Sequence, residues 1–216
     1  KKIESIEDLS ITTNASLLDN YLYDLKSAGL TRINISLDSL NQERFFRVTG
    51  SHSYKKVLTS IYNAIKLKFK VKLNMVAMSD ITEAEIISYV SLAYKYPIEV
   101  RFIEFMPLCG EAWQPELMIP IEKIKSVIKN YCNLERVTSV SNVAEVYNIR
   151  EGKGRVGFIA SLTEPFCNNC SRIRLTAYGV IRPCLFSNHG IPIGAHLKDK
   201  GDYEKIVEAL KYALGT

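Results

Sequence analysis

The sequence has no apolar run that approaches the roughly 20 residues of a membrane-spanning helix. It also lacks low-complexity segments and blocks of like charge, because the net charge of +5 is spread along the chain. The densest basic run, 66–72, alternates lysine with apolar residues and predicts only a weak preference for anionic ligands. No signal peptide is recognisable at the start, so we expect a cytoplasmic protein with no membrane or nucleic-acid partner. In that reducing compartment, cysteines are better interpreted as metal ligands than as disulfides.

The chain has 216 residues, of which 47% are hydrophobic, enough to bury the core of one large or two small domains. It begins with Lys1-Lys2, has no initial methionine, and soon enters an apolar strand. We therefore expect a fragment of a longer protein.

Strand and helix patterns alternate in the first half. Apolar alternation predicts strands over 9–13, 31–37, 71–78 and 98–105. Helical spacing predicts helices between them, one ended by Gly29 and one opened by a capping box from Thr82 to Glu85. This order favours parallel strands with right-handed crossovers.

The strands carry polar residues where a sheet buried on both faces would be apolar. The alternate polar positions are Asn34, Ser36, Lys72, Asn74, Glu99 and Arg101. They either line a ligand-filled barrel lumen, which would supply their partners, or lie on the exposed face of an open sheet.

The pattern changes after Pro107. Cys109 and Trp113 lie in a connector, and a helix follows from Pro120 with Ile121, Ile124, Val127, Ile128 and Tyr131 directed inward. Residues 134–162 predict antiparallel strands, with Gly152, Gly154 and Gly157 as turn points. A last helix is expected over 203–214 with Asp202 as its cap. We expect a barrel domain over 1–108 and an α+β extension over 109–216.

Three of the five cysteines, Cys167, Cys170 and Cys184, have the spacing of a turn followed by a short hairpin. Tyr178-Gly179 offers the hairpin turn. Three thiolates suit a four-iron cluster with one open iron, whereas zinc would need His189 or Cys109 as a fourth ligand. The third alternative is ordinary half-buried thiols.

Arg172 and Arg174 follow Cys170 at strand spacing, so their guanidinium groups would project to one side. They would either donate bidentate hydrogen bonds to phosphate oxygens or balance the negative charge of metal-bound thiolates. For Arg182, beside Cys184, the counter-charge role is favoured.

With strands and cysteines placed together, the chain resembles the molybdenum cofactor biosynthesis protein A family, the GTP 3′,8-cyclases of the radical S-adenosylmethionine superfamily. The matching stretches are Thr12-Thr13-Asn14, the segment 32–39, Arg47-Val48-Thr49-Gly50, the segment 71–74, the segment 101–106 and the cysteine hairpin with its Arg-Ile-Arg. They follow the family's order over nearly the whole chain. The three-cysteine spacing followed by Arg-x-Arg is the most specific of them.

The resemblance implies an incomplete TIM-type β/α barrel with a C-terminal extension that carries an auxiliary [4Fe-4S] cluster. Cys167, Cys170 and Cys184 match the ligands of that cluster. The positions that match GTP contacts are Thr12, Lys72, Arg172, Ile173 and Arg174. Ser36 and Met106 match contacts to S-adenosylmethionine.

The activity that the resemblance implies is conversion of GTP to (8S)-3′,8-cyclo-7,8-dihydroguanosine 5′-triphosphate. A second [4Fe-4S] cluster cleaves S-adenosylmethionine in the family, and the protein holds GTP so that its ribose faces the resulting radical. The family's C-x3-C-x-x-C motif for that cluster is absent from this sequence, as are its Gly-Gly-Glu-Pro stretch and C-terminal double glycine. We therefore expect the 216 residues alone to be unable to cleave S-adenosylmethionine.

Besides GTP, a homodimer and a downstream enzyme of the cofactor pathway are the candidate partners that go with this resemblance. Two other functions compete with it. One is a zinc-binding module that attaches to nucleic acid, which the C-x-x-C and the positive charge support. The other is a different radical enzyme with an auxiliary cluster.

Overall fold

The computed structural model describes residues 6–107, 113–138, 143–167, 170, 172–187, 189–198 and 202–214. The chain forms two compact units. The sheet unit comprises 1–105 and 116–165, and the cysteine unit comprises 106–115 and 166–216. The expected domain boundary between 108 and 109 stays a prediction.

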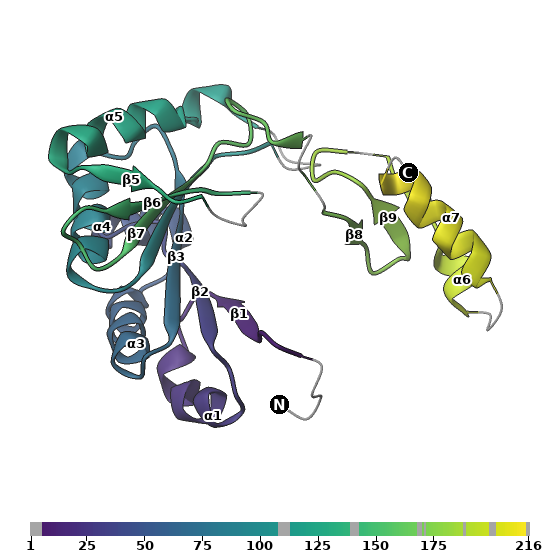
Figure 1. The fold of residues 1–216 in the computed structure, drawn as a ribbon, viewed down its shortest axis with the longest axis horizontal. Helices are drawn as coiled ribbons and strands as arrows, with labels where there is room; N and C mark the ends of the chain where they lie inside the picture. Colours follow the sequence, from purple (N-terminus) through teal and green to yellow (C-terminus); the bar gives the residue numbers. More distant parts are fainter. Residues whose placement is uncertain are drawn as a thin grey trace. The chain divides into compact units, whose positions relative to one another are not determined.

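The sheet unit is built on one seven-stranded sheet (Figure 1). Its strands are β1 (Ser10–Thr13), β2 (Arg32–Ser36), β3 (Lys70–Ala77), β4 (Glu99–Glu104), β5 (Leu134–Arg136), β6 (Glu145–Ile149) and β7 (Arg155–Ile159). They lie in the order β1-β2-β3-β4-β7-β6-β5. The pairs from β1 to β7 are parallel, and β7-β6 and β6-β5 are antiparallel. The predicted α/β class with a mostly parallel sheet is confirmed, while closure into a partial barrel stays a proposal.

Apart from α2, the helices of the sheet unit follow the predicted alternation. They are η1 (Leu18–Tyr21), α1 (Leu22–Ser27), α2 (Gln42–Thr49), α3 (Tyr54–Lys66), α4 (Glu83–Lys95) and α5 (Ile121–Tyr131), and the short η2 (Pro115–Leu117) precedes α5. In Figure 1, α3, α4 and α5 lie along one side of the strands. The prediction that Tyr131 points inward is wrong, because this last residue of α5 is 48% exposed.

The helix α2 was not predicted. Asn41 caps it by accepting the backbone N–H groups of Glu43 and Arg44 at 3.0 and 2.9 Å. Gly50 ends it with φ of 67°, the left-handed conformation that glycine adopts without strain.

The capping box at the start of α4 is half formed. Thr82 accepts the backbone N–H of Glu85 through its hydroxyl oxygen at 3.2 Å, as predicted. The carboxylate of Glu85 does not complete the box by accepting the Thr82 backbone N–H. It accepts the Leu40 backbone N–H at 3.0 Å and the Ser39 hydroxyl instead. This buried side chain therefore ties α4 to the loop after β2.

The core lies between the sheet and the helices, as the period-two pattern requires. Ile33 and Ile35 of β2, Leu73 of β3 and Val100 and Phe102 of β4 are each completely buried. Their neighbours along each strand face the opposite side, which carries the polar residues discussed below.

Antiparallel strands over 134–162 were predicted, and β5, β6 and β7 confirm this. That they extend the parallel sheet through β4 and β7 was not predicted. The prediction that Gly157 marks a turn is wrong, because this residue lies inside β7.

The cysteine unit contains a three-stranded antiparallel sheet of β8 (Arg174–Leu175), β9 (Val180–Arg182) and β10 (Ile191–Pro192), with α6 (Gly194–Lys198) and α7 (Tyr203–Leu214). The predicted turn is confirmed, and Gly179 takes φ of 73° in it. The Asp202 carbonyl accepts the Ile206 N–H at 3.1 Å, which confirms that α7 begins after Asp202. In the part of the chain that the structure describes, none of the helices has both the length and the apolar character of a membrane span.

Candidate functional site

Two rows of polar residues cross the strands on the face of the sheet opposite the core. The strand registers pair Thr12 with Asn34, Asn34 with Lys72 and Lys72 with Glu99. Further toward the strand ends they pair Ser36 with Asn74, Asn74 with Arg101 and Arg101 with Gly157. The second row reaches the carboxyl end of β2 at Ser36, and α/β proteins bind ligands at that edge of a parallel sheet, so the face that carries both rows is the candidate binding face.

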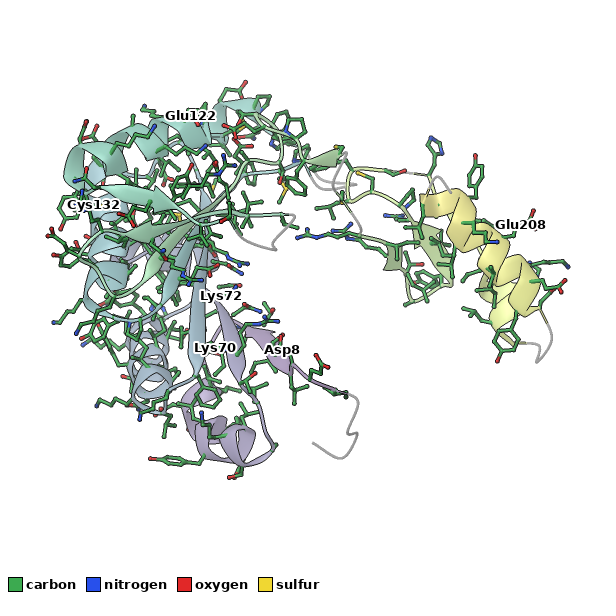
Figure 2. The ribbon with its side chains drawn as sticks, in the orientation of Figure 1. Asp8, Lys70, Lys72, Glu122, Cys132 and Glu208 are labelled. Carbon is green, nitrogen blue, oxygen red and sulfur yellow. The ribbon has the colours of Figure 1, made fainter. Side chains whose placement is uncertain are left out.

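The centre of this face is an ion cluster of three residues. The Oε1 atom of Glu99 lies 2.5 Å from Nε of Arg101 and 3.4 Å from Nζ of Lys72. The side chains of Lys72, Glu99 and Arg101 are only 21%, 12% and 18% exposed. Figure 2 shows Lys70 and Lys72 along β3. One carboxylate shared by two cations leaves the cluster with an excess of positive charge in a half-buried position, which suits an anionic ligand.

Burial is the main reason that the pKa of Lys72 is lowered from its usual value. The carboxylate of Glu99 counteracts this, and the positive charges of Arg101 and Arg32 add to the lowering. An anion on this face would therefore bind to a lysine that holds its proton less firmly than an exposed one.

Polar atoms without partners lie beside the cluster. Among the described residues, Oδ1 of Asn74 and Nε of Arg32 are buried and have no hydrogen-bond partner. The other end of the Arg32 guanidinium lies 2.7 Å from Asp8 and donates to the Ser10 hydroxyl at 3.3 Å. A buried acceptor such as Asn74 Oδ1 is costly unless a ligand donates to it.

The predicted contact residues of the sheet unit lie on this face. Thr12 and Lys72 are in one row, with Asn34 between them donating to the Thr12 hydroxyl oxygen at 3.4 Å. Ser36 is the exposed last residue of β2. Met106 follows the end of β4 and belongs to the cysteine unit.

The three predicted cluster cysteines are exposed free thiols of the cysteine unit. Cys170 and Cys167 lie in one turn, in which the Cys170 N–H donates to the Cys167 carbonyl at 3.1 Å. Cys184 follows the end of β9 and its Sγ accepts the Phe186 N–H at 3.4 Å. Because β8 and β9 are antiparallel, Cys170 and Cys184 flank the same open end of the hairpin.

These donors fit an iron–sulfur cluster in type and in topology. Within the described ranges, however, no group of three or more Cys, His, Asp or Glu side chains converges as metal ligands would. Cys109 lies outside the described residues. Cys132 belongs to the sheet unit, and burial raises the pKa of its thiol. The auxiliary cluster therefore stays a proposal.

The arginines of the cysteine unit face each other across the hairpin. Arg174 of β8 is directly opposite Arg182 of β9, and the buried Nε of Arg182 has no hydrogen-bond partner. Arg172 and Ile173 are exposed and precede β8, so only Arg174 of the predicted pair is in a strand. Like charges on opposed strand positions destabilise a hairpin unless an anion lies between them.

Two charged networks on the core side were not foreseen. Arg44, with a side chain only 6% exposed, donates to Asp80 at 2.7 and 3.1 Å and to the Asp38 carbonyl at 2.6 Å. Glu104 is completely buried at the end of β4. The signal for Glu104 was available, because a charge occupied a position where the alternation of β4 calls for an apolar residue.

Two family models match the chain. The model described as Molybdenum Cofactor Synthesis C matches residues 98–216, and the model described as the Radical SAM superfamily matches residues 1–93.

Similar curated proteins cover nearly all of the chain. It is 42% identical to the GTP 3′,8-cyclase of Alkaliphilus oremlandii, over 98% of this chain and 66% of that protein. For the GTP 3′,8-cyclase of Syntrophomonas wolfei the identity is 38%, over 99% of this chain and 67% of that protein. For molybdenum cofactor biosynthesis protein 1 of Drosophila melanogaster it is 35%, over 99% of this chain and 38% of that protein. The chain thus spans about two thirds of the length of the bacterial relatives.

A solved structure supports the fold. SuiB of Streptococcus suis, solved with bound S-adenosylmethionine, superposes with a TM-score of 0.61 over 91% of this chain and 49% of that one, at 14% identity. The likeness at this identity concerns the fold alone. One family model covers more than half of the chain, and the curated relatives match nearly all of it. The chain therefore belongs to the Molybdenum Cofactor Synthesis C family and to the radical SAM superfamily.

Proposed function

We propose that this chain forms the substrate-holding part of a GTP 3′,8-cyclase in molybdenum cofactor biosynthesis. The observation that carries the proposal is the half-buried cluster of Lys72, Glu99 and Arg101 on the polar face of the parallel strands. Its excess positive charge suits a triphosphate, and relatives that share about 40% of this sequence are named GTP 3′,8-cyclases.

Each predicted site residue has a role in this proposal. Lys72 and Thr12 hold GTP from the sheet unit, and Arg172, Ile173 and Arg174 hold it from the cysteine unit. The seven-stranded sheet would form a partial TIM-type barrel, with its polar face as the wall of the lumen. Ser36 and Met106 contact S-adenosylmethionine.

Cys167, Cys170 and Cys184 would hold the auxiliary [4Fe-4S] cluster. S-adenosylmethionine and the iron–sulfur clusters supply the radical chemistry when they are bound. The chain's own task is to fix the phosphates and the base of GTP so that one C–H bond of the ribose is held in a reactive orientation. A homodimer, a downstream enzyme that takes the product and a cytoplasmic location are proposed together with this function.

Replacement of the matching region in a relative tests the function directly. This chain should substitute for the 215-residue matching region of the Alkaliphilus oremlandii enzyme and retain conversion of GTP to the cyclised product under anaerobic reduction. The same hybrid with Lys72→Met should form 5′-deoxyadenosine but little cyclised product, because the radical would form without a correctly held substrate. A hybrid that folds and forms 5′-deoxyadenosine while GTP is left unchanged would contradict the proposal.

Metal analysis tests the cluster by a readout that does not depend on activity. After anaerobic reconstitution, the chain should hold about four irons and lose them in Cys184→Ala. One tightly bound zinc without iron would instead favour a zinc module.

A further inference from the structure

The segment 166–198 of the cysteine unit carries positive charge without a carboxylate of its own. It contains three arginines and one lysine, and no aspartate or glutamate. None of the three arginines forms an ion pair with a described residue. Their charge must therefore be balanced by bound thiolates or by an anion that the segment binds. The arginines are Arg172, Arg174 and Arg182.

Arg182 lies at the centre of the small sheet of this unit. It belongs to β9, the middle strand of the three, and is directly opposite Arg174 of β8. Side chains at such paired positions share one face of the sheet, with β-carbons about 5 Å apart. Arg182 is half-buried, and its buried Nε has no hydrogen-bond partner among the described residues. A buried donor beside a second cation is costly unless an anion accepts from it.

The stem of Arg182 is held by the chain that leads into β10. Gly190 immediately precedes that strand, and a β-carbon on it would be 3.3 Å from Cγ of Arg182 and 2.8 Å from the carbonyl oxygen of Ile181. The backbone of residue 190 therefore packs against the arginine. On the other face of β9 the side chain of Ile181 is 2% exposed, which fixes the strand from that side. A guanidinium group on a fixed stem loses little freedom when it binds an anion.

A phosphate group matches these two arginines better than thiolates do. In an iron–sulfur cluster the irons offset much of the thiolate charge, so the cluster offers its surroundings little net negative charge. The counter-charge role that the place of Arg182 beside Cys184 favours would therefore leave excess positive charge. Phosphate keeps its negative charge at neutral pH, and its oxygens accept paired hydrogen bonds from guanidinium groups. One phosphate group between Arg174 and Arg182 accounts for both the excess charge and the unpaired Nε.

We propose that Arg174 and Arg182 bind one phosphate group between them, which makes Arg182 a further triphosphate-binding residue. The positions that match GTP contacts in this unit end at Arg174, so Arg182 extends them along the neighbouring strand. Identification of this phosphate as one of GTP rests on the proposed function. Binding of inorganic triphosphate by the two arginines does not depend on it.

Titration calorimetry with inorganic triphosphate tests the pair directly. The anaerobically reconstituted chain is compared with Arg182→Met, which keeps an apolar stem and loses the charge. We expect a dissociation constant about tenfold higher in the variant, as for the loss of a charge-assisted hydrogen bond. Lys205→Met is the matched control, because it removes a positive charge from the same unit at a side chain that already pairs with Asp202 at 3.0 Å. It should leave the constant unchanged.

The same titrations with GTP separate this inference from the proposed function. Arg182→Met should weaken GTP binding by the same factor as triphosphate binding. A wild-type chain that binds triphosphate with the expected dependence on Arg182 but does not bind GTP would support the phosphate site and contradict the proposed function. Equal binding of both ligands by wild type and Arg182→Met would overturn the phosphate site alone.

Three further results overturn the proposal. One is a wild-type chain that does not bind triphosphate, and another is an equal loss in Lys205→Met. The third is a shifted reduction potential of the bound iron in Arg182→Met with unchanged triphosphate affinity, which would assign Arg182 to the thiolates. If Arg182→Met does not fold, Arg182→Lys decides by the same comparison and should also bind triphosphate more weakly, because lysine keeps the charge but lacks the planar pair of donors.

Discussion

Gly157 of β7 lies beside the side chain of Arg101 on the polar face of the sheet, close enough that a β-carbon at residue 157 would be 3.2 Å from Cγ of Arg101. The glycine therefore leaves the space in which Arg101 reaches Glu99. A methyl group there would displace the arginine by a few tenths of an ångström.

Gly157→Ala should therefore weaken the binding of GTP while the fold is retained. We expect the free energy of GTP binding to weaken by about 1 kcal/mol, the size of one perturbed hydrogen bond, measured by titration calorimetry with GTP. The control is Val156→Ala, in the same strand on the core face. It should lower the free energy of unfolding but leave GTP affinity unchanged. If both variants bind GTP as the wild type does, Arg101 does not contact the ligand.

Lys72→Met should weaken GTP binding, because a half-buried cation that faces the ligand is lost. The pKa of Lys72 is lowered, mainly by burial, so the free protein loses this proton at a lower pH than an ordinary lysine does. GTP affinity should then fall as pH rises through the alkaline range, below the pH at which an ordinary lysine titrates, relative to Lys72→Arg, which stays charged throughout. A constant ratio of the two affinities over the alkaline range would contradict a role for the Lys72 charge.

Arg172→Ala and Arg174→Ala should each weaken binding of GTP by about 1 to 3 kcal/mol, because a charge-assisted hydrogen bond to phosphate is lost. The matched control is Arg136→Ala in the sheet unit, an exposed arginine that lies 3.1 Å from Glu145 and away from the polar rows. Titration calorimetry at two salt concentrations gives the comparison. Unchanged affinity in both variants would leave only the role of balancing thiolate charge.

Asp80→Asn should destabilise the sheet unit most at neutral pH. The hydrogen bonds from Arg44 hold the pKa of Asp80 below its usual value. A lowered folded pKa contributes stability that is complete above about pH 4 and disappears as pH falls through the folded value. Because Asp80 is 42% exposed, we expect about 1 kcal/mol.

Urea unfolding of wild type and Asp80→Asn between about pH 3 and pH 7 measures this difference. The two curves should converge at the acid end. Asp24→Asn, an exposed aspartate of α1, serves as the control for the change in net charge. A stability difference that is the same at every pH would show that the ion pair with Arg44 is not its cause.

Local patterns in the sequence predicted the elements whose burial is periodic. The alternation around Ile33 and Ile35 and the stripe along α3 led to correct strands and helices, because one face of each is in the core. The helix α2 escaped this reasoning because its two buried positions are Arg44 and Phe45, and Asp80, the partner of Arg44, lies in the loop between β3 and α4.

The candidate site was predictable only in part for the same reason. Lys72, Glu99 and Arg101 were recognisable as polar positions on their own strands, but the contacts among them depend on the register between β3 and β4, which no single strand reveals. The buried carboxylate of Glu104 accepts hydrogen bonds from the backbone N–H groups of Leu162 and Thr163, 58 and 59 positions further along the chain, and a local pattern cannot show such a partner.

The opposition of Arg174 and Arg182 in the short hairpin has a thermodynamic consequence. Any anion that neutralises both side chains is linked to the folding of β8 and β9, so ligand occupancy and local order should rise together. Raising the ionic strength would relieve the same repulsion without the ligand and so reduce that linkage.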